Sequence, residues 1–298
     1  MKALLKVGYT CNNNCVFCHS SEHRARRDLT TAELLRKVDL CAAAGRTMVV
    51  LSGGEPTVRG DLLQVAEHVA RRGLDLGLVS NGRMLSYGTL LDRLIALRLR
   101  YLYVSLHGDR EVHDAMVRAP AYEQSLGGAR AAAARGLAPT VNCVVTRHNL
   151  RRLRGVVDAL LGVGRLTVKY SMVEAKGNAL DDFDRVVPTV AEAAAAIADG
   201  IGHAQARGLQ AAHDGTPLCL LPGLDHLYDD LVTNGFADMS EAFEDRLFPV
   251  DELNRVKPGA VCGGCALAPR CPGLYVAYHE RRGDRELAPV APSGRAGA

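Results

Sequence analysis

Short apolar runs alternate with amphipathic segments from residue 4 to residue 206 of the chain. The runs have the length and the Val, Leu and Tyr content of buried strands, whereas the segments between them repeat apolar residues at helical spacing. The expected strands are Leu4–Tyr9, Met48–Leu51, Leu74–Val79, Tyr101–Leu106, Thr140–Val145 and Leu166–Tyr170. The expected helices are one that begins at the capping box Thr30-x-x-Glu33, and Asp61–Arg72, Leu90–Leu97, Ser125–Arg135, Leu150–Leu161 and Val190–Ala206. Strands and helices that alternate in this way predict an α/β fold with a parallel sheet.

Polar motifs follow the first four expected strands directly. The strands lead, in order, into a cysteine loop at 11–18, into Gly53-Gly54-Glu55-Pro56, into Asn81 and into His107. In parallel βα sheets and barrels, functional residues gather at the carboxyl ends of the strands. The pattern therefore predicts that these motifs lie at the functional edge of the sheet.

The cysteine loop carries Cys11, Cys15 and Cys18, spaced by three and then by two residues. Cysteine thiolates are the ligands of iron–sulfur clusters, and a [4Fe–4S] cube normally takes four of them. Three ligands would leave one iron open to a cofactor or substrate, as catalytic metals keep a free position. A zinc knuckle and three unrelated buried cysteines are the alternative interpretations.

Composition narrows the class of protein. The chain has 298 residues, 48% of them apolar, and 36 basic against 33 acidic residues, which gives a net charge of +3 and no case for nucleic acid or a membrane as a partner. Its N-terminus does not have the pattern of a signal peptide, and no apolar run approaches the length of a membrane span, so we expect a cytoplasmic protein. Nine cysteines in such a protein indicate metal ligands rather than disulfides, although Cys41 and Cys143, in apolar segments, are expected to be buried and structural.

The cysteine spacing and the segment Ser52–Pro56 resemble the radical S-adenosylmethionine (radical SAM) enzymes. The resemblance extends over about residues 1–210. It implies a partial (β/α)6 TIM-like barrel that is open on one side, which the pattern of strands alone does not distinguish from an open sheet. It also implies that the amine and carboxylate of S-adenosylmethionine (SAM) chelate the open iron.

The same resemblance assigns contacts to SAM. Gly53, Gly54 and Glu55 match the strand end beside the methionine amine, where glycines permit close backbone approach and a carboxylate could accept from the ammonium. Phe17 matches an aromatic position near the adenine. A simple strand-to-helix turn and an apolar loop anchor are the respective alternatives.

Four further residues are expected to contact SAM. The resemblance places Asn81 and Ser105 at strand ends near the sugar or the carboxylate, and Arg118 at the carboxylate. Asn142, on the fifth strand, would point inward to SAM or to a hydrogen bond in the core. A surface salt bridge is the alternative for Arg118.

The implied activity is reductive cleavage of SAM to a 5′-deoxyadenosyl radical that abstracts hydrogen from a substrate. An electron donor of the flavodoxin or ferredoxin type would then be a partner. A non-catalytic iron–sulfur electron carrier is a remote alternative, because a carrier has no need of an open iron beside SAM-binding strand ends.

A second group of cysteines resembles part of the SPASM or twitch extensions, which carry auxiliary [4Fe–4S] clusters. Cys262, Cys265 and Cys271 lie close together in the sequence, and Cys219 is the one upstream candidate for a fourth ligand. We expect one auxiliary cluster, with a zinc site as the alternative. Without Cys219 as a ligand, the auxiliary iron would be open.

The expected domains are a radical SAM core at 1–208, a SPASM/twitch-like auxiliary cluster domain at 209–287 and a flexible tail at 288–298. Within the second, the acidic segment Leu220–Asp251 is expected to form a solvated helical face, and Tyr275 and Tyr278 to pack against the cluster lobe.

Relatives with such extensions most often modify peptides, notably ribosomal natural products. A peptide is therefore the expected substrate, and a small molecule such as a sugar, nucleoside or cofactor precursor is the alternative. Only ten residues precede Cys11, so leader recognition is expected to need a separate leader-peptide-binding protein.

Overall fold

The computed structural model describes residues 1–250 and 254–291, and its centre is a curved, nine-stranded sheet with the order β7-β6-β5-β4-β3-β2-β1-β8-β9. Neighbouring strands from β7 to β8 run parallel, and β9 is antiparallel to β8. The strands are β1 (Lys2–Lys6), β2 (Met48–Ser52), β3 (Asp75–Ser80), β4 (Leu99–Ser105), β5 (Thr140–Val145), β6 (Thr167–Met172), β7 (Gln210–Asp214), β8 (Phe236–Ser240) and β9 (Phe248–Pro249). A separate antiparallel pair consists of β10 (Arg255–Val256) and β11 (Leu274–Tyr275).

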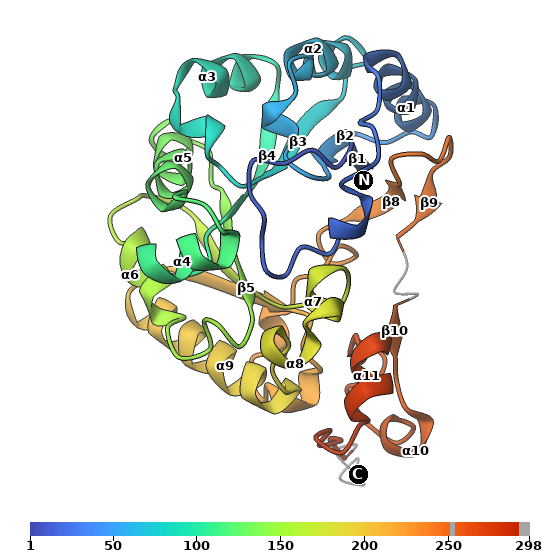
Figure 1. Cartoon of the computed structure of the whole chain (residues 1–298). Coiled ribbons are helices and arrows are strands. Elements are labelled where there is room, and N and C mark those ends of the chain that lie inside the picture. Colours follow the sequence, from blue (N-terminus) through green and yellow to red (C-terminus); the bar gives the residue numbers. More distant parts are fainter. Residues whose placement is uncertain (251–253, 292–298) are drawn as a thin grey trace, which may run out of the picture.

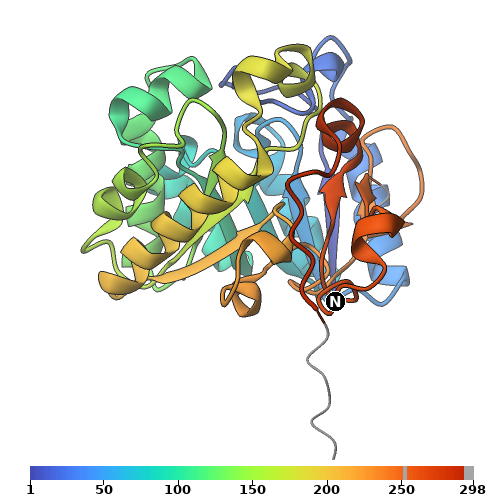
Figure 2. The same cartoon turned by 90° about the horizontal axis from the view of Figure 1, so that it is seen from below.

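Helices surround the convex side of this sheet and give the molecule the form of an incomplete barrel (Figure 1). Figure 2 shows α9 along the outside of the sheet, beside β7. The helices are α1 (Thr31–Ala43), α2 (Leu62–Arg71), α3 (Thr89–Ala96), α4 (Arg110–Val117), α5 (Tyr122–Ala134), α6 (Arg154–Leu160), α7 (Asn178–Asp181), α8 (Phe183–Val186), α9 (Val190–Ala206), α10 (Gly259–Cys262) and α11 (Val276–Arg282). Among the described residues, no helix is long and apolar enough to span a membrane.

The six expected strands are present as β1 to β6, and the partial barrel is confirmed. The alternation predicted them because each strand carries apolar residues that the core buries, including Leu5 of β1, Leu51 of β2 and Val141 of β5. Cys41 and Cys143 are fully buried, as expected. Helix α4 was not expected, because only Val112, Met116 and Val117 give it an apolar face.

Strands from the segment after residue 208 extend the sheet at both ends. β7 pairs with β6, and β8 pairs with β1. The expected helical face at 220–251 is therefore wrong for its described part, up to residue 250, where β8 and β9 lie instead. Residues 236–240 alternate between buried and half-buried, the period of a strand, and β8 covers the edge of β1 that would otherwise be unpaired.

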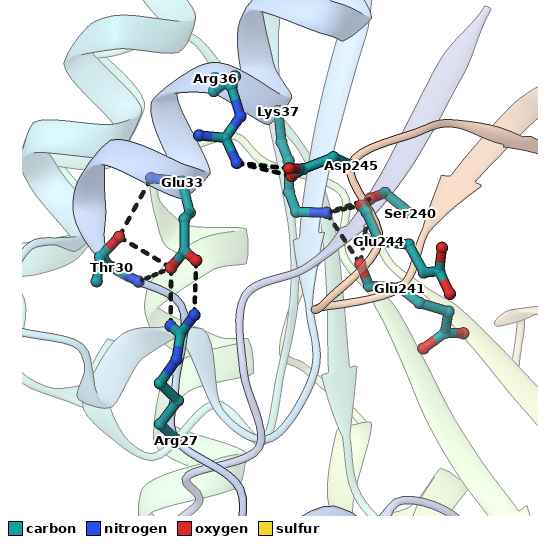
Figure 3. Close-up of polar contacts among 9 residues, drawn as sticks. All are labelled: Arg27, Thr30, Glu33, Arg36, Lys37, Ser240, Glu241, Glu244 and Asp245. Atoms are coloured by element: carbon teal, nitrogen blue, oxygen red, sulfur yellow. Dashed lines mark hydrogen bonds and ion pairs between the residues drawn. The ribbon is translucent and has the colours of Figure 1, made fainter.

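Helix α1 fastens the segment after β8 to the barrel (Figure 3). The ammonium of Lys37, a residue only 1% exposed, donates to Ser240 Oγ at 2.7 Å and to the carbonyl oxygens of Glu241, at 2.9 Å, and Glu244. The preceding residue on α1, exposed Arg36, pairs with Asp245 at 2.8 Å. Acidic residues of this segment thus form ion pairs with the barrel in place of a solvated face.

Candidate active site

The cysteine loop follows β1 and is held by the end of α4. The amides of Asn14 and Val16 donate to the carbonyl oxygens of Val117, at 2.9 Å, and Met116, at 2.8 Å. Val16 and Phe17 also pack against the apolar face of α4. An irregular loop that carries three cysteines therefore has a fixed shape set by a helix about a hundred residues away in the chain.

Asn178, at the start of α7, holds the other side of the loop. Its amide donates to the carbonyl oxygen of Cys18 at 3.0 Å, and its side chain donates to that of Cys15 at 2.8 Å. The preceding Gly177 has φ of 50°, and a Cβ there would lie 2.5 Å from Cys18 O, so only glycine fits. The sequence analysis did not identify these two residues.

Two arginines bind the asparagines of the loop. Arg83 donates to Asn12 O at 2.6 Å and to Asn13 Oδ1 at 2.9 Å. Arg24 donates to Asn13 O at 3.1 Å and to Asn14 Oδ1 at 2.9 Å. Arg24 also lowers the pKa of the Cys11 and Cys15 thiols, although burial has the larger effect, raising the Cys15 pKa to about 12.

Gly53 and Gly54 permit β2 to end directly against the end of β1. A Cβ on Gly53, whose φ is 132°, would lie 2.4 Å from Gly8 O, and one on Gly54 would lie 2.2 Å from Thr10 O. Gly54 instead donates its N–H to Gly8 O at 2.9 Å. The glycines are therefore required for the close packing of this strand end on the segment that delivers the cysteines; their contact with SAM stays a prediction.

The side chain of Glu55 is buried between the ends of β2 and β3. The residue is 1% exposed, and Oε1 accepts from Thr57 N at 3.0 Å and Ser80 Oγ at 2.9 Å, while Oε2 accepts from Asn81 N at 2.6 Å. Burial raises the pKa of this carboxyl. Both oxygens are occupied, so Glu55 joins the ends of β2 and β3 and positions Asn81.

One cavity of about 360 Å³ collects most of the expected site. It is enclosed by the cysteine loop and the carboxyl ends of the strands. The expected residues that line it are Cys11, Cys15, Phe17, Cys18, Gly53, Gly54, Asn81, Ser105 and Asn142. Sheet register explains the grouping, since Ser105 and Asn142 are paired neighbours on β4 and β5.

Arg118 does not line this cavity. It is exposed and ends α4 in the left-handed conformation, with φ of 53°. The cavity-lining arginine is Arg24 instead.

Asn81 and Asn142 are held by side chains within the site. Asn81 Nδ2 donates to Asn12 Oδ1 in the cysteine loop at 2.6 Å. Asn142 Oδ1 accepts from Ser171 Oγ at 2.8 Å, which leaves the amide NH₂ of Asn142 as its free donor in the described structure.

The cavity is also lined by His107, which the sequence placed at the functional edge without a role, and by Ser171, Glu174, Asp214 and Tyr275, which the sequence did not indicate. Asp214 accepts from the buried Lys169 at 2.9 Å, and Arg255 lies 3.5 Å from the centre of the Tyr275 ring. Tyr275, expected to pack against the cluster lobe, lies on β11 of that segment and pairs with β10, and it also lines this cavity. Tyr278 is likewise directed at the barrel, where its hydroxyl accepts from Val190 N at 2.9 Å.

The four C-terminal cysteines line a second, small cavity. Pro217, Val261, Leu287 and Pro289 make its wall largely apolar. The cysteines are Cys219, Cys262, Cys265 and Cys271. Cys219 thus lies with the other three, although more than 40 residues separate it from them.

Backbone amides point at two of these sulfurs. Leu218 N and Gly273 N lie 3.3 and 3.4 Å from Cys271 Sγ, and Val290 N lies 3.3 Å from Cys265 Sγ. Residues 288–291 of the expected tail therefore pack against this cavity, and 292–298 lie outside the described residues.

The arrangement of the cysteines bears on the kind of centre that each set could hold. In the described ranges, no three His, Cys, Asp or Glu side chains are placed to hold one metal ion. The cysteines of a [4Fe–4S] cube bind different irons and need not converge on a point. N–H groups directed at sulfur and a positive charge near the thiols are the environment that thiolate ligands require.

In a comparison with protein families, residues 5–160 match the model of the radical SAM superfamily. Among curated proteins, the chain is 29% identical to an AdoMet-dependent heme synthase of Methanosarcina barkeri over 182 residues, 60% of this chain and 52% of that protein. It is 30% identical to a PqqA peptide cyclase of Ruegeria pomeroyi, over 65% of this chain and 52% of that protein. It is 32% identical to a probable GTP 3',8-cyclase of Methanopyrus kandleri, over 58% of this chain and 56% of that protein. The chain thus spans about half the length of these relatives.

Solved structures share the fold. SuiB of Streptococcus suis bound to S-adenosylmethionine has a TM-score of 0.66 at 14% identity, covering 98% of this chain and 76% of that one. The anSMEcpe structure with bound AdoMet has a TM-score of 0.54 at 16% identity, and the match covers 72% of this chain and 64% of that chain.

Proposed function

The chain belongs to the radical SAM superfamily, and from this premise we propose that it cleaves SAM reductively at a [4Fe–4S] cluster held by Cys11, Cys15 and Cys18. One observation carries the proposal. The three cysteines of one loop line the same cavity as the glycine strand end of β2, with Asn81 and Ser105 beside them. A cluster with three protein ligands keeps one iron for SAM, and when both are bound they supply a 5′-deoxyadenosyl radical that abstracts hydrogen from the substrate.

The residues of the chain bind and orient SAM and exclude water. Arg24 provides positive charge beside the cysteine loop, and the backbone of Gly53 and Gly54 forms the wall beside it. Asn81 and Ser105 offer hydrogen bonds at the next strand ends. We propose that Glu55 acts by positioning Asn81, and Arg118 stays a weaker proposal because it is exposed.

We propose a peptide as the substrate. The PqqA peptide cyclases are relatives in sequence, and relatives in fold include SuiB bound to precursor peptide SuiA and anSMEcpe bound to a Cp18Cys peptide. The cavity has a volume of about 360 Å³ and extends to residues of β6, β7 and β11, which would leave room for one side chain of a peptide beside SAM. A small-molecule substrate is the second candidate, favoured by the heme synthase and GTP 3',8-cyclase among the relatives.

The four C-terminal cysteines support a second proposal, an auxiliary [4Fe–4S] cluster with Cys219 as its fourth ligand. All four line one cavity, so such a cluster would have no iron left for substrate. It would store or transfer an electron, or stabilise a segment of short elements. An electron donor of the flavodoxin or ferredoxin type, a separate leader-peptide-binding protein and a cytoplasmic location complete the proposal.

The test is anaerobic reconstitution with iron and sulfide, followed by reduction and addition of SAM. We expect 5′-deoxyadenosine from the unaltered chain and none from Cys15→Ala. The exposed variant Asp92→Asn, on the outer helix α3, serves as a control. Absence of 5′-deoxyadenosine from reduced protein that contains the cluster would contradict the proposed function.

A further inference from the structure

His107 is fixed on three sides within the wall of the active-site cavity. The residue is 2% exposed. Its Nδ1 accepts from Val144 N at 3.2 Å, its own N–H donates to His113 Nδ1 at 3.1 Å, and its carbonyl oxygen accepts from Asn149 Nδ2 at 2.9 Å. Neither the ring nor the backbone can move without loss of these bonds.

These contacts also determine the proton on the ring. A backbone N–H donates to Nδ1, so in the neutral imidazole the hydrogen is carried by Nε2. Burial, together with the neighbouring His113, holds the pKa of His107 well below its usual value. The ring is therefore neutral, and Nε2 is a hydrogen-bond donor.

This donor faces the cavity without a partner. His107 lines the cavity, and no hydrogen bond to Nε2 exists among the described residues, nor is that atom enclosed by protein. An N–H of a side chain so deeply buried costs free energy unless something accepts from it. The fold has thus placed one rigid, uncharged donor on the surface that a ligand would contact.

Phe17 identifies the part of the ligand that would lie there. Its ring meets that of His107 edge to face, with centroids 4.8 Å apart and planes at 83°. An aromatic surface beside a neutral donor matches a planar heterocycle with ring-nitrogen acceptors. The charged methionine end of SAM suits the iron and Arg24, whereas its adenine has three acceptor nitrogens and a flat apolar face.

We propose that His107 Nε2–H donates to a ring nitrogen of the adenine of SAM, with Phe17 against the base. The inference rests on the proposed function and extends it to base recognition. His107 becomes a residue that contacts the cofactor and selects its nucleobase. Its two buried partners, Val144 N–H and His113, act by positioning it.

Two substitutions separate the donor from the structural role of the ring. In His107→Asn, the amide oxygen can replace Nδ1 as acceptor for Val144 N, but the Nε2 donor is lost. In His107→Gln, the longer amide can return a donor to the Nε2 position. His203→Asn, on the outer helix α9, is the matched control.

The measurement is equilibrium binding of S-adenosylhomocysteine and its 1-deaza, 3-deaza and 7-deaza analogues to the reconstituted chain by calorimetry. We expect His107→Asn to bind S-adenosylhomocysteine about tenfold more weakly, and His107→Gln to recover part of the loss. The unaltered chain should bind one deaza analogue about tenfold more weakly than the parent, and His107→Asn should no longer make that distinction.

Two results would overturn the inference. The first is equal binding of all three deaza analogues and the parent by the unaltered chain, which needs no variant to fold. The second is a deaza preference that persists in His107→Asn. Failure to bind S-adenosylhomocysteine at all, with no 5′-deoxyadenosine formed from SAM, would instead contradict the proposed function.

Discussion

Two cysteine sites of this chain differ in what surrounds them. The first, at 11–18, opens into a cavity of about 360 Å³ with amides, hydroxyls and Arg24 in its wall. The second, with Cys219 and three later cysteines, lines a small cavity whose other walls are largely apolar. Three cysteines beside a larger cavity with polar groups in its wall would suit a reactive centre, whereas four cysteines around a small apolar cavity would suit a closed one.

The supports of the two sites differ as well. The first loop is held by α4, α7 and the end of β2, which belong to the barrel. The second depends on short elements, β10, β11 and α10, and on residues near 288–291. A site that must keep an open ligand position needs rigid elements around it. Three ligands alone would not fix the orientation of a cluster.

The largest expected effect separates the two sites by their iron. Cys15→Ala should remove all 5′-deoxyadenosine formation and lower the iron count from about eight to about four per chain. Cys271→Ala should lose a similar amount of iron but retain cleavage of SAM. Iron analysis and chromatography of 5′-deoxyadenosine check both. If reconstituted Cys271→Ala keeps the first cluster but no longer cleaves SAM, the two sites do not have separate roles.

A smaller effect tests how the C-terminal segment is attached to the barrel. Lys37→Met leaves Ser240 Oγ and two carbonyl oxygens without their donor, so we expect the free energy of unfolding to fall by about 2 kcal/mol. Arg36→Met, one position away on α1, removes only an exposed ion pair and should cost at most about 1 kcal/mol. Urea unfolding measures both free energies of unfolding. Equal losses in the two variants would show that the buried ammonium stabilises the fold no more than the exposed ion pair does.

Within the first site, Glu55→Gln should lower the free energy of unfolding by about 1–2 kcal/mol. Glu55 now accepts hydrogen bonds from Asn81 N and from the hydroxyls of Thr57 and Ser80. The new amide NH₂ is itself a donor, so it would leave at least one of these groups without an acceptor. SAM affinity should fall too, because Asn81 loses its position. Glu111→Gln, on the exposed side of α4, is the control. Unchanged stability and affinity would count against Glu55 as a positioning residue.

The pH dependence of stability includes the two buried histidines near the first site, His107 and His113, together with His19, His148 and His213, whose pKa values burial also lowers. Burial lowers the pKa of His113 to about 4 and that of His107 well below its usual value. Both are neutral when folded, but the unfolded chain binds protons below about pH 6.5. Stability should therefore be full above that pH and fall as the pH drops toward 4, by about 1.4 kcal/mol per pH unit for each histidine.

His113→Asn keeps an acceptor for His107 N. It should remove the contribution of one histidine to the loss of stability with falling pH. Urea unfolding of the iron-free chain at pH 7 and pH 5.5 measures it. A slope unchanged by the substitution would show that His113 is not the group that titrates.

Sequence predicted which side chains would gather at one cavity where their grouping depends on the strand order; their roles toward a cofactor stay predictions. The cysteine loop follows β1, Ser105 ends β4, and Asn142 lies beside Ser105 in the register of β4 and β5, so parallel pairing brings them together. The direction of the Glu55 side chain could not be predicted, because it depends on Ser80 and Asn81, which reach it only through the pairing of β2 with β3.

Long-range pairing also hid the role of the acidic segment. Nothing local in 236–240 shows that it pairs with β1, since Asp238 interrupts the apolar pattern and its ion partner, Arg46, is remote in the sequence. The ring of His107 gave a similar difficulty. Its place after a strand was evident, but the free donor at Nε2 follows only from the bond between Nδ1 and Val144 N.

Mössbauer spectroscopy of the reconstituted chain, enriched in ⁵⁷Fe, tests the contrast between an open and a closed site most directly. Spectra are recorded before and after SAM is added. We expect SAM to change the spectrum of one iron site per chain out of about eight. This change should be absent in Cys15→Ala and present in Cys271→Ala. A change that is lost in Cys271→Ala and retained in Cys15→Ala, or no change at all, would contradict the contrast between the two sites.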